Sequence, residues 1–521
     1  MIARYRANAR GARASVSGNP AITSWRDEEC AAVTALSIRE QFLGAIAFAG
    51  DLSMGQPPEH SPATAILAAR LATEAGTSAQ TQSLSAQLAM IRWAGCTANA
   101  REFADLLGDD VRGRAELLAD RNPFVAKEPP AASLHGVMVP LATIHCEAAA
   151  EIARRANLDR ALITAVGDLF ENWDGSGLPR GVRGEDIDQC AQFVSLASDL
   201  EIFSRCYGPA RAVMLIEARG GRIYPADLAL RIGRDGPNWL SDLPKADLVS
   251  EALNLCSLRA LNHPFDRPAA IRLLADYADL KRPERTGAAR KAGRLAGQIA
   301  RHLGLTADAR KSVEEAALLS GLGFVAVANT SFATSGRVDA ETLRLAPHWT
   351  ERILSRAPEF SEIAKLASMA FERLDGSGRH RGLTASALSI EARIVQLSIA
   401  AIEFRLTYPP HTFRPQSDLR SWLETEVAAG RLDAAAARAA LHVLGAADED
   451  PGAEDHGIPQ ITARERDVLG LLIRGLTNKA IARDLDLSPK TVSTHLEHIY
   501  AKLGVSTRAA AAIKALDRGL F

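Results

Sequence analysis

The sequence predicts an all-α protein built from several domains. At 521 residues the chain exceeds what a single hydrophobic core supports, and its 47% hydrophobic and 24% charged residues are ordinary for a globular protein. Aromatic residues make up only 5%, and alanine is abundant, a composition that favours helices. Apolar residues recur at three- and four-residue spacing in segments such as 67–76 and 146–158, and no sustained alternating run predicts a sheet.

Cysteine usage and hydropathy narrow the class of protein further. The six cysteines are scattered without a C-x-x-C pair, which argues against a disulfide framework and a zinc site and favours a reducing compartment. The longest apolar stretches, such as 316–327, are too short to cross a bilayer. We therefore expect a cytoplasmic protein with no membrane partner, whose arginine-rich residues 1–29 form a disordered tail.

A short acidic, glycine-rich segment occurs twice. FENWDGSG at 170–177 returns 201 residues later as FERLDGSG at 371–378, and six of the eight residues are identical. Further identities share this offset, and upstream the matching offset becomes 228. The pattern predicts two copies of one helical domain, at 30–265 and 270–445. The aspartate of each segment can bond its own turn, and the glycines permit left-handed backbone.

After the second copy, an acidic stretch with glycine and proline at 446–459 predicts a solvated linker, and the residues from 460 to 521 differ in pattern. Thr462 with Glu465 predicts a capping box at the start of one helix, Thr477 starts another, and Ser488-Pro489 starts a third. In the third helix Val492, Leu496, Ile499 and Leu503 share one face, which leaves the polar first turns free.

This arrangement is typical of a helix-turn-helix whose third helix enters the major groove of duplex DNA. Ten basic residues against six acidic ones from 461 onward favour a nucleic-acid partner. Lys479, Arg483 and Lys502 are predicted to neutralise phosphates, while the start of the third helix faces the bases. The predicted DNA-binding residues are Asn478, Lys479, Arg483, Ser488, Lys490, Thr491, Ser493, Thr494, His495 and Lys502.

Residues 460–521 resemble the LuxR-type (GerE-like) helix-turn-helix over their whole length. The matching pieces are T-x-R-E-R-D-V-L, G-L-T-N-K-x-I-A, L-x-L-S-P-K-T-V-x-x-H-L and K-L-G-V-x-x-R. One departure is Ser493, where the family often has lysine. In this family the fourth helix, here near 507–518, commonly pairs two modules, so the resemblance implies a homodimer on double-stranded DNA.

The repeated domain resembles the HD-GYP branch of the HD-domain phosphohydrolases. The matching stretch is E-x-x-D-G-S-G-x-x-R-G, followed by an A-x-x-V-x-L helix, and the resemblance covers most of both copies. In active members, histidines and aspartates bind two or three metal ions that activate water for attack on a phosphodiester, often cyclic di-GMP. The resemblance therefore implies a phosphodiesterase wherever the metal ligands are present.

Most of the ligand positions that this resemblance implies hold other residues. The His-Asp pair falls on Arg92-Trp93 in the first copy and on Ser320-Gly321 in the second. The first copy keeps His60, His145 and Glu171, and the second keeps only Glu372. We therefore predict no metal, no cofactor and no catalytic residue, so that the protein is not an enzyme but carries two degenerate HD-GYP-like copies.

These observations lead to one principal hypothesis and two alternatives. The principal hypothesis is a sequence-specific DNA-binding transcription regulator whose body senses a ligand or partner, dimerises, or does both. Its effector would be a small molecule or nucleotide, in a candidate pocket at His60, Arg92, His145 and Glu171. The first alternative is a metal-dependent phosphodiesterase or phosphohydrolase in the first copy, which requires His60 and His145 to meet Glu171 or Asp199. The second is a ligand-free dimerisation scaffold.

Overall fold

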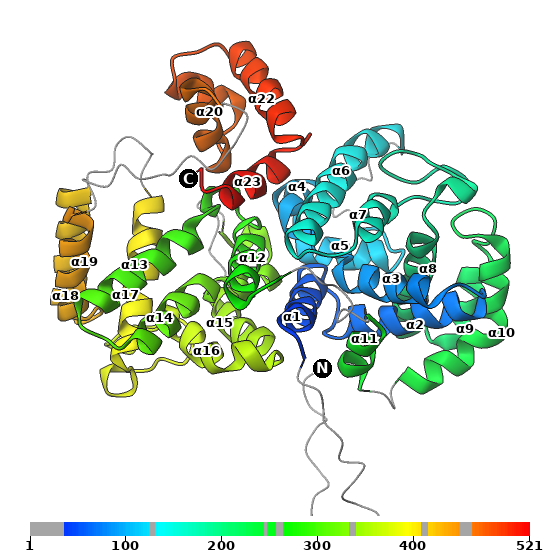
Figure 1. The fold of residues 1–521 in the computed structure, drawn as a ribbon, viewed down its shortest axis with the longest axis horizontal. Helices are drawn as coiled ribbons and strands as arrows, with labels where there is room; N and C mark the ends of the chain where they lie inside the picture. Colours follow the sequence, from blue (N-terminus) through cyan, green and yellow to red (C-terminus); the bar gives the residue numbers. More distant parts are fainter. Residues whose placement is uncertain are drawn as a thin grey trace, which may run out of the picture. The chain divides into compact units, whose positions relative to one another are not determined.

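The computed structural model describes residues 36–123, 131–243, 247–256, 264–332, 340–407, 415–446 and 461–520. Within these ranges every regular element is a helix (Figure 1), and the β-structure there amounts to three isolated bridges. The prediction of an all-α protein is confirmed. The predicted tail at 1–29 lies outside the described residues, as does the linker at 446–459 except for its first residue.

The first helical region covers residues 36–256. Helix α2 is its centre, because α2 packs against both α3 and α8 (Figure 1). Large apolar side chains such as Phe42, Ile66 and Phe193 are fully buried there. The α-helices are α1 Ile38–Ser53, α2 His60–Glu74, α3 Ala79–Ile91, α4 Ala100–Leu107, α5 Asp110–Leu118, α6 Ala131–Arg155, α7 Arg160–Ala165, α8 Gln189–Tyr207, α9 Pro209–Glu217, α10 Ala226–Asp242 and α11 Leu248–Cys256, and the 3₁₀ turns include η1 Cys96–Asn99, η2 Val166–Asp168 and η3 Gly184–Asp186.

The second helical region covers residues 264–446. Helix α13 packs against α14 and α17, as α2 packs against α3 and α8 in the first region. The α-helices are α12 Arg267–Asp279, α13 Ala288–His302, α14 Ala307–Leu319, α15 Ala340–Ser355, α16 Pro358–Ser368, α17 Ile390–Leu406, α18 Arg420–Ala428 and α19 Ala434–Ala446, and the short turns include η6 Pro283–Arg285, η7 Leu322–Ala326, η8 Asn329–Phe332, η9 Met369–Phe371, η10 Ala385–Ala387 and the π-helical η11 Pro415–Leu419.

Unusual backbone features recur in the two regions at the offsets of the sequence repeat. In each region, the second residue of the central helix (α2 or α13) donates its backbone N–H to an aspartate ten residues earlier in the chain. Ser61 N donates to Asp51 at 3.0 Å, and Ala289 N donates to Asp279 at 2.9 Å. The residue before each central helix is left-handed, with φ 80° at Glu59 and 79° at Gly287. Shared turns and caps of this kind position the helices of both regions in the same way.

The repeated octet forms the same tight turn in both regions. Asp174 Oδ1 accepts a hydrogen bond from Ser176 N at 2.9 Å, and Asp375 Oδ1 does so from Ser377 N at 2.9 Å. The glycines that follow the aspartates have φ of 85° at Gly175 and 80° at Gly376, where a side chain would be strained. The octet is therefore a structural corner in both places, as its sequence predicts.

Helix α6 corrects one sequence-based expectation. Its segment His135–Arg155 is the one stretch within the described ranges that is long and apolar enough to cross a membrane by length and composition. Half of its most apolar window is buried, and α6 contacts η1, η2, α7 and α23. These contacts are those of a core helix. The expectation that every apolar stretch is too short was wrong for this helix.

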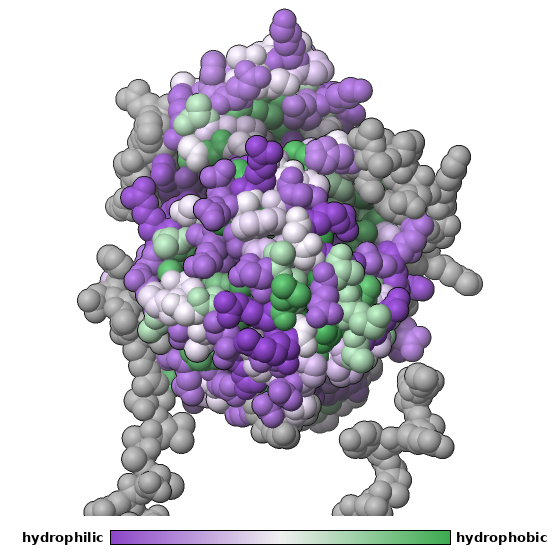
Figure 2. Space-filling model, turned by 90° about the vertical axis from the view of Figure 1, so that its right-hand side faces the viewer, coloured by the Kyte–Doolittle hydropathy of each residue, from purple (hydrophilic) through white to green (hydrophobic). Residues whose placement is uncertain are grey.

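The surface shown in Figure 2 is mostly polar, with small apolar patches between charged side chains. Small, separate patches of this kind are normal on folded proteins. The large hydrophobic side chains that are exposed within the described ranges are Val137, Tyr207, Met214, Leu230 and Leu345.

A close backbone approach at Gly95 gives a test of the fold. A Cβ at this position would lie 2.0 Å from the carbonyl oxygen of His145, so Gly95→Ala should force η1 away from α6 and cost about 1–3 kcal/mol. Gly136 on α6 has no atom within 4 Å of such a Cβ, so Gly136→Ala should be neutral or stabilising by up to about 1 kcal/mol. Calorimetric melting temperatures of the two variants provide the comparison. Equal melting temperatures would contradict the close approach.

Candidate nucleic-acid interface and ligand pockets

The C-terminal domain is a compact set of four helices around one core. They are α20 Ala463–Ile473, α21 Asn478–Asp484, α22 Pro489–Leu503 and α23 Arg508–Asp517. The predicted capping box is present, because Thr462 Oγ1 accepts from Glu465 N and the Glu465 carboxylate accepts from Thr462 N at 2.8 Å. The predicted face of α22, Val492, Leu496, Ile499 and Leu503, is buried.

The start of α22 is an exposed polar surface of this domain. Ser488 caps the helix by accepting a hydrogen bond from Thr491 N at 3.0 Å, and Pro489 occupies the first turn. Lys490, Thr491 and Thr494 are exposed, while Ser493 and His495 are half-buried. This surface matches the predicted recognition helix, since its donors and acceptors face outward on the turns that would enter the major groove.

Helix α21 fixes the orientation of α22. Asn478 Nδ2 donates to Ser493 Oγ at 3.3 Å, which joins the two helices at their N-terminal turns. Ser493 Oγ also donates to Pro489 O within its own helix at 3.1 Å. Both predicted DNA contacts are therefore engaged within the domain, and they position the recognition helix. Lys479 and Arg483 on α21 are exposed, as phosphate contacts require.

Lys502 departs from its predicted role as a phosphate contact. Its Nζ lies 2.6 Å from Oε2 and 2.8 Å from Oε1 of Glu465, a carboxylate that is 3% exposed. Burial works to raise the pKa of Glu465, but the hydrogen bonds from Lys502 and Thr462 hold it below its usual value. The charge of Lys502 is thus balanced inside the domain, where it stabilises the capping box.

Helix α23 packs mainly against α6 of the first helical region and also touches the second region. Ala509 and Ile513 form a buried cluster with Ala148 and Leu280, and the partly buried Ile144 packs against it. At one end of α23, Ser506 N donates to Glu147 at 3.3 Å. At the other end, Arg155 Nε lies 3.1 Å from the Asp517 carboxylate. The helix that was predicted to pair two modules is covered here by α6 of the same chain.

The predicted ligand pocket is reorganised around a buried indole, Trp93, which is 1% exposed. The ring of Trp93 stacks at 6.4 Å on that of His60 and at 6.4 Å on that of Phe170, and it meets His145 edge-on at 6.1 Å. Trp93 stands where the family resemblance places an aspartate ligand. A bulky indole therefore fills space that the resemblance assigns to metal ions.

The two predicted histidines are both engaged by protein atoms. His60 Nδ1 lies 2.5 Å from Glu201 Oε2, and its Nε2 lies 3.4 Å from Ser198 Oγ. Although burial opposes it, the charge of His60 lowers the pKa of Glu201 to about 2. His145 Nε2 lies 2.7 Å from Arg92 O, to which it donates, and burial lowers the pKa of His145 to about 3, so its ring is neutral.

Arg92 and Glu171 also serve the fold in this structure. Arg92 donates to Val194 O at 3.0 Å and covers the Trp93 ring at 4.6 Å, and burial lowers its pKa. Glu171 Oε1 accepts from Arg180 N at 2.8 Å, and burial raises the pKa of Glu171. The cavity beside Trp93 is lined by His145, whereas His60, Arg92 and Glu171 lie outside its wall. Of the four residues predicted to form one ligand pocket, only His145 therefore lies on the wall of this cavity.

Asp199, the other predicted partner of a metal, bonds to protein atoms as well. Its carboxylate accepts a hydrogen bond from the hydroxyl of Tyr224, and Arg219 lies 4.0 Å away. Across the described ranges, no group of three or more His, Cys, Asp or Glu side chains is placed to hold a metal ion. The ligand set that the first alternative requires, His60 and His145 with Glu171 or Asp199, is not assembled in this arrangement.

In the second region, a cationic pocket of about 530 Å³ lies beside the second octet. Arg373 and Arg379 line it and make no salt bridge within the described ranges, while Arg431 pairs with Glu426 at 2.7 Å. Aromatic side chains complete its wall, and Phe404 stacks on Trp422 with ring centroids 4.6 Å apart. Guanidinium groups beside aromatic faces suit a ligand with phosphates and flat rings. Sequence reasoning missed this cluster, because Arg373 and Arg379 lie in the octet loop whereas Arg431 comes from a distant part of the chain.

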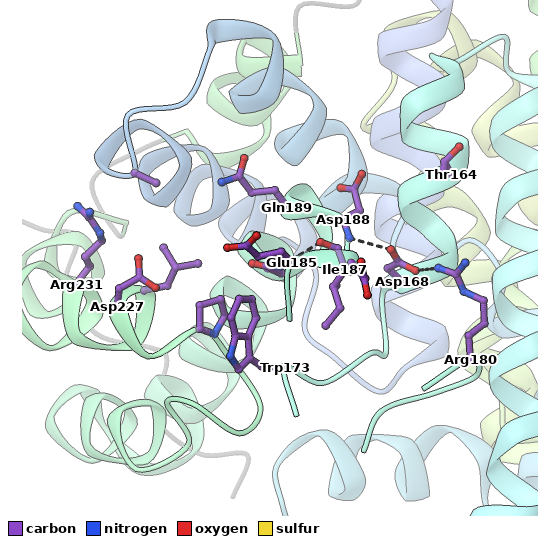
Figure 3. A pocket seen from close by; sticks show the side chains of 15 residues that line it. Thr164, Asp168, Trp173, Arg180, Glu185, Ile187, Asp188, Gln189, Asp227 and Arg231 are labelled. Carbon is purple, nitrogen blue, oxygen red and sulfur yellow. Dashed lines mark hydrogen bonds and ion pairs between the residues drawn. The ribbon is translucent and has the colours of Figure 1, made fainter. Parts of the chain in front are cut away.

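A third pocket, of about 630 Å³, lies beside the first octet (Figure 3). It is lined by acidic side chains, including Asp168, Glu185 and Asp227. Asp168 is committed to the loop itself, because it pairs with Arg180 and accepts from Asp188 N at 2.9 Å. Acidic side chains repel phosphate groups, so this pocket does not suit a phosphorylated ligand or DNA.

Comparison with known proteins assigns the C-terminal helices. Residues 459–515 match the family model of bacterial regulatory proteins of the luxR family. The C-terminal domain is a LuxR-type helix-turn-helix. Within the LuxR-type domain, the chain is 41% identical over 66 residues to the transcriptional regulatory protein MctR of Rhizobium johnstonii. It is 39% identical over 67 residues to the nitrate/nitrite response regulator protein NarL of Escherichia coli. Each match covers 13% of this chain and 31% of the relative.

The second helical region contains an HD domain, whose family model matches residues 272–421. The chain is also 28% identical over 258 residues to 3'3'-cGAMP-specific phosphodiesterase 3 of Vibrio cholerae. This match covers 48% of the chain and 56% of the relative, so the chain spans little more than half of that protein. A crystal structure of a cyclic GMP-AMP specific phosphodiesterase of V. cholerae (V-cGAP3) has a similar fold, with a TM-score of 0.54, 19% identity and coverage of 78% of this chain and 97% of that one.

This homology corrects one sequence-based prediction. The missing metal ligands led us to predict that the protein is not an enzyme, but the relationship of its HD domain to a 3'3'-cGAMP phosphodiesterase points toward phosphodiesterase activity.

The ion pair of Lys502 gives a test of the DNA interface. Lys502→Met should lower the melting temperature of the LuxR-type domain, because it leaves the buried Glu465 carboxylate without its cation. The slope of log affinity against log salt should stay unchanged, whereas Lys479→Met should reduce it by about one. Fluorescence anisotropy on a fixed duplex measures both slopes. A reduced slope for Lys502→Met would restore its role as a phosphate contact.

Proposed function

We propose that the protein is a sequence-specific DNA-binding transcription regulator whose helical body senses a ligand or partner. The observation that carries the proposal is the start of α22, where Lys490, Thr491 and Thr494 are exposed on a helix whose other face is buried in the domain core. A polar helix face that serves no core, on a LuxR-type domain, has the form of a DNA-reading surface.

The body of the regulator is, on this proposal, two copies of one HD-type fold, at 30–265 and 270–445. The carboxylate caps at Asp51 and Asp279 support it, because they recur at the offset of the sequence repeat. So does the hydrogen bond that the Glu side chain of each octet accepts from the backbone N–H nine residues later, Glu171 from Arg180 and Glu372 from Arg381. The body works in the cytoplasm, where its DNA target is.

The proposed regulator acts as a homodimer, as the LuxR resemblance implies. In the structure the apolar face of α23 lies on α6, and Arg290 donates to Leu516 O at 2.8 Å. Pairing of two modules through α23 therefore requires that this helix leave α6. A change in the helical body that weakens this contact would therefore free α23 to pair two DNA-binding modules.

The DNA-binding proposal is tested by substitution on the recognition helix. Lys490→Ala and Thr494→Ala should each weaken binding of the full chain to its selected duplex by about tenfold, which corresponds to about 1.4 kcal/mol. Arg466→Ala, on the exposed face of α20, serves as the matched control. Anisotropy titrations at one fixed salt concentration give the three affinities. Unchanged binding by both α22 variants would reject this recognition surface.

A second candidate function is cyclic-dinucleotide chemistry in the HD body. The similarity to a 3'3'-cGAMP-specific phosphodiesterase favours it, and the cationic, aromatic-lined pocket of the second region supplies groups suited to phosphates and bases. The same pocket would hold a nucleotide effector if the ligand is sensed rather than cleaved.

The nucleotide proposal is tested with 3'3'-cGAMP as the probe. Arg373→Ala should weaken its binding to the full chain at least tenfold, because a charge-assisted hydrogen bond contributes about 1.5–3 kcal/mol. Arg420→Ala, exposed on α18 outside the pocket, is the control. Calorimetry measures binding, and chromatography after incubation with Mn²⁺ measures turnover. Turnover supports the phosphodiesterase, binding without turnover supports the effector, and no binding contradicts both.

A further inference from the structure

A separate, largely apolar cavity of about 180 Å³ lies beside Trp93 in the first helical region. Its wall is formed by η1, α4, α5, α6 and the octet loop, through apolar side chains such as Phe103, Leu141 and Phe170. It takes Phe170 from the octet and His145 from the predicted ligand pocket, and it is distinct from the cationic pocket of the second region. Its chemistry differs from what a phosphodiester needs.

The polar groups in the cavity wall carry no free charge for a ligand. Arg114 is 1% exposed, and its guanidinium donates to Cys96 O at 2.9 Å and to Asn99 Oδ1 at 2.7 Å, with Asp110 at 3.6 Å. His145 is neutral because burial lowers its pKa to about 3. A charged ligand would lose its hydration here without gaining a counter-charge, so the cavity selects neutral molecules.

One residue of the wall, Trp93, has a polar atom without a partner. The indole Nε1 of Trp93 is buried and makes no hydrogen bond within the described ranges. A buried donor left unpaired costs about 1–3 kcal/mol, and an acceptor on a ligand would recover that energy. The Trp93 and Phe170 rings also line the cavity, and such faces and edges pack well against another aromatic ring.

The volume limits the size of the ligand. An engineered apolar cavity of about 150 Å³ in another protein binds benzene. A cavity of about 180 Å³ therefore has room for one six-membered ring and a few further atoms. We propose that this cavity binds a small, neutral, monocyclic aromatic molecule that carries one hydrogen-bond acceptor, such as an aryl ketone or aldehyde. The proposal names the effector class of the proposed regulator and rests on that function only for its effect on DNA.

Helix α6 connects the cavity to the LuxR-type domain. Met138, Leu141, Ala142 and His145 line the cavity, while Ile144, Glu147 and Ala148 contact α23. A ligand that changes the position of α6 therefore changes the surface on which α23 rests. Occupancy of the cavity is thereby coupled to the helix that would pair two DNA-binding modules.

The test uses acetophenone as the probe and the full chain. Titration calorimetry should show saturable binding of one molecule per chain. Ala142→Phe places a ring in the cavity and should weaken binding at least tenfold, as should Met138→Trp if the first variant unfolds. Ala161→Phe adds the same ring at an exposed position on α7 and should bind like the natural protein.

The role of the indole N–H is tested by a second probe. Trp93→Phe should weaken acetophenone binding by about tenfold relative to ethylbenzene, which has no acceptor and should lose less. If Trp93→Phe weakens the binding of both probes equally, the indole N–H does not bond to the ligand. Binding that Ala142→Phe and Met138→Trp leave unchanged, or no binding at all, would overturn the proposed site.

DNA binding by the same preparations separates this proposal from the regulator itself. If acetophenone binds in the cavity and shifts duplex affinity at least threefold, the effector proposal is supported. If acetophenone binds but no duplex is recognised, the regulator proposal fails while the site stands. If the duplex is recognised but acetophenone does not bind, the site fails while the regulator stands.

Discussion

One buried indole, Trp93, is the packing contact around which the candidate site of the first helical region is organised. Trp93 lies against His60 and Phe170 by stacking and against His145 by its edge, and Arg92 covers its face. Both histidines then find protein partners, Glu201 for one and the Arg92 carbonyl for the other. The apolar cavity follows from the same packing, since the ring, Phe170 and α6 enclose it without filling it.

The two helical regions share a framework but differ in chemistry. Carboxylate caps and tight octet turns recur in both, and they fix where α2 and α13 start and where the loops close. Inside this framework the first region has a neutral apolar cavity and the second a cationic aromatic one. The different linings of the two cavities suit different ligands.

Local sequence signals predicted local structure well. The capping box of Thr462 and Glu465, the proline at the start of α22 and the turn at Asp174 depend on residues within a few positions of each other, so their geometry follows from the sequence. Contacts over long separations were missed. The pair of Lys502 with Glu465 and the packing of Ile513 near Ala148 depend on tertiary structure, which leaves no periodic signal.

The candidate site shows the same division. The sequence placed His60, Arg92, His145 and Glu171 near one another because the resemblance aligned them with metal ligands, but the size of Trp93 was not part of that reasoning. The indole separates His60 from His145 and leaves only the latter on the cavity wall. Helix α6 was likewise misjudged by hydropathy, because its apolar residues serve the core and α23.

Selection of duplexes from a random library by the full chain, followed by sequencing, tests the central claim most directly. The expected result is one enriched motif, whose enrichment falls clearly for the Lys490→Ala variant while that variant stays folded. Uniform recovery of all sequences by the folded natural chain would contradict the claim that this protein reads DNA sequence through α22.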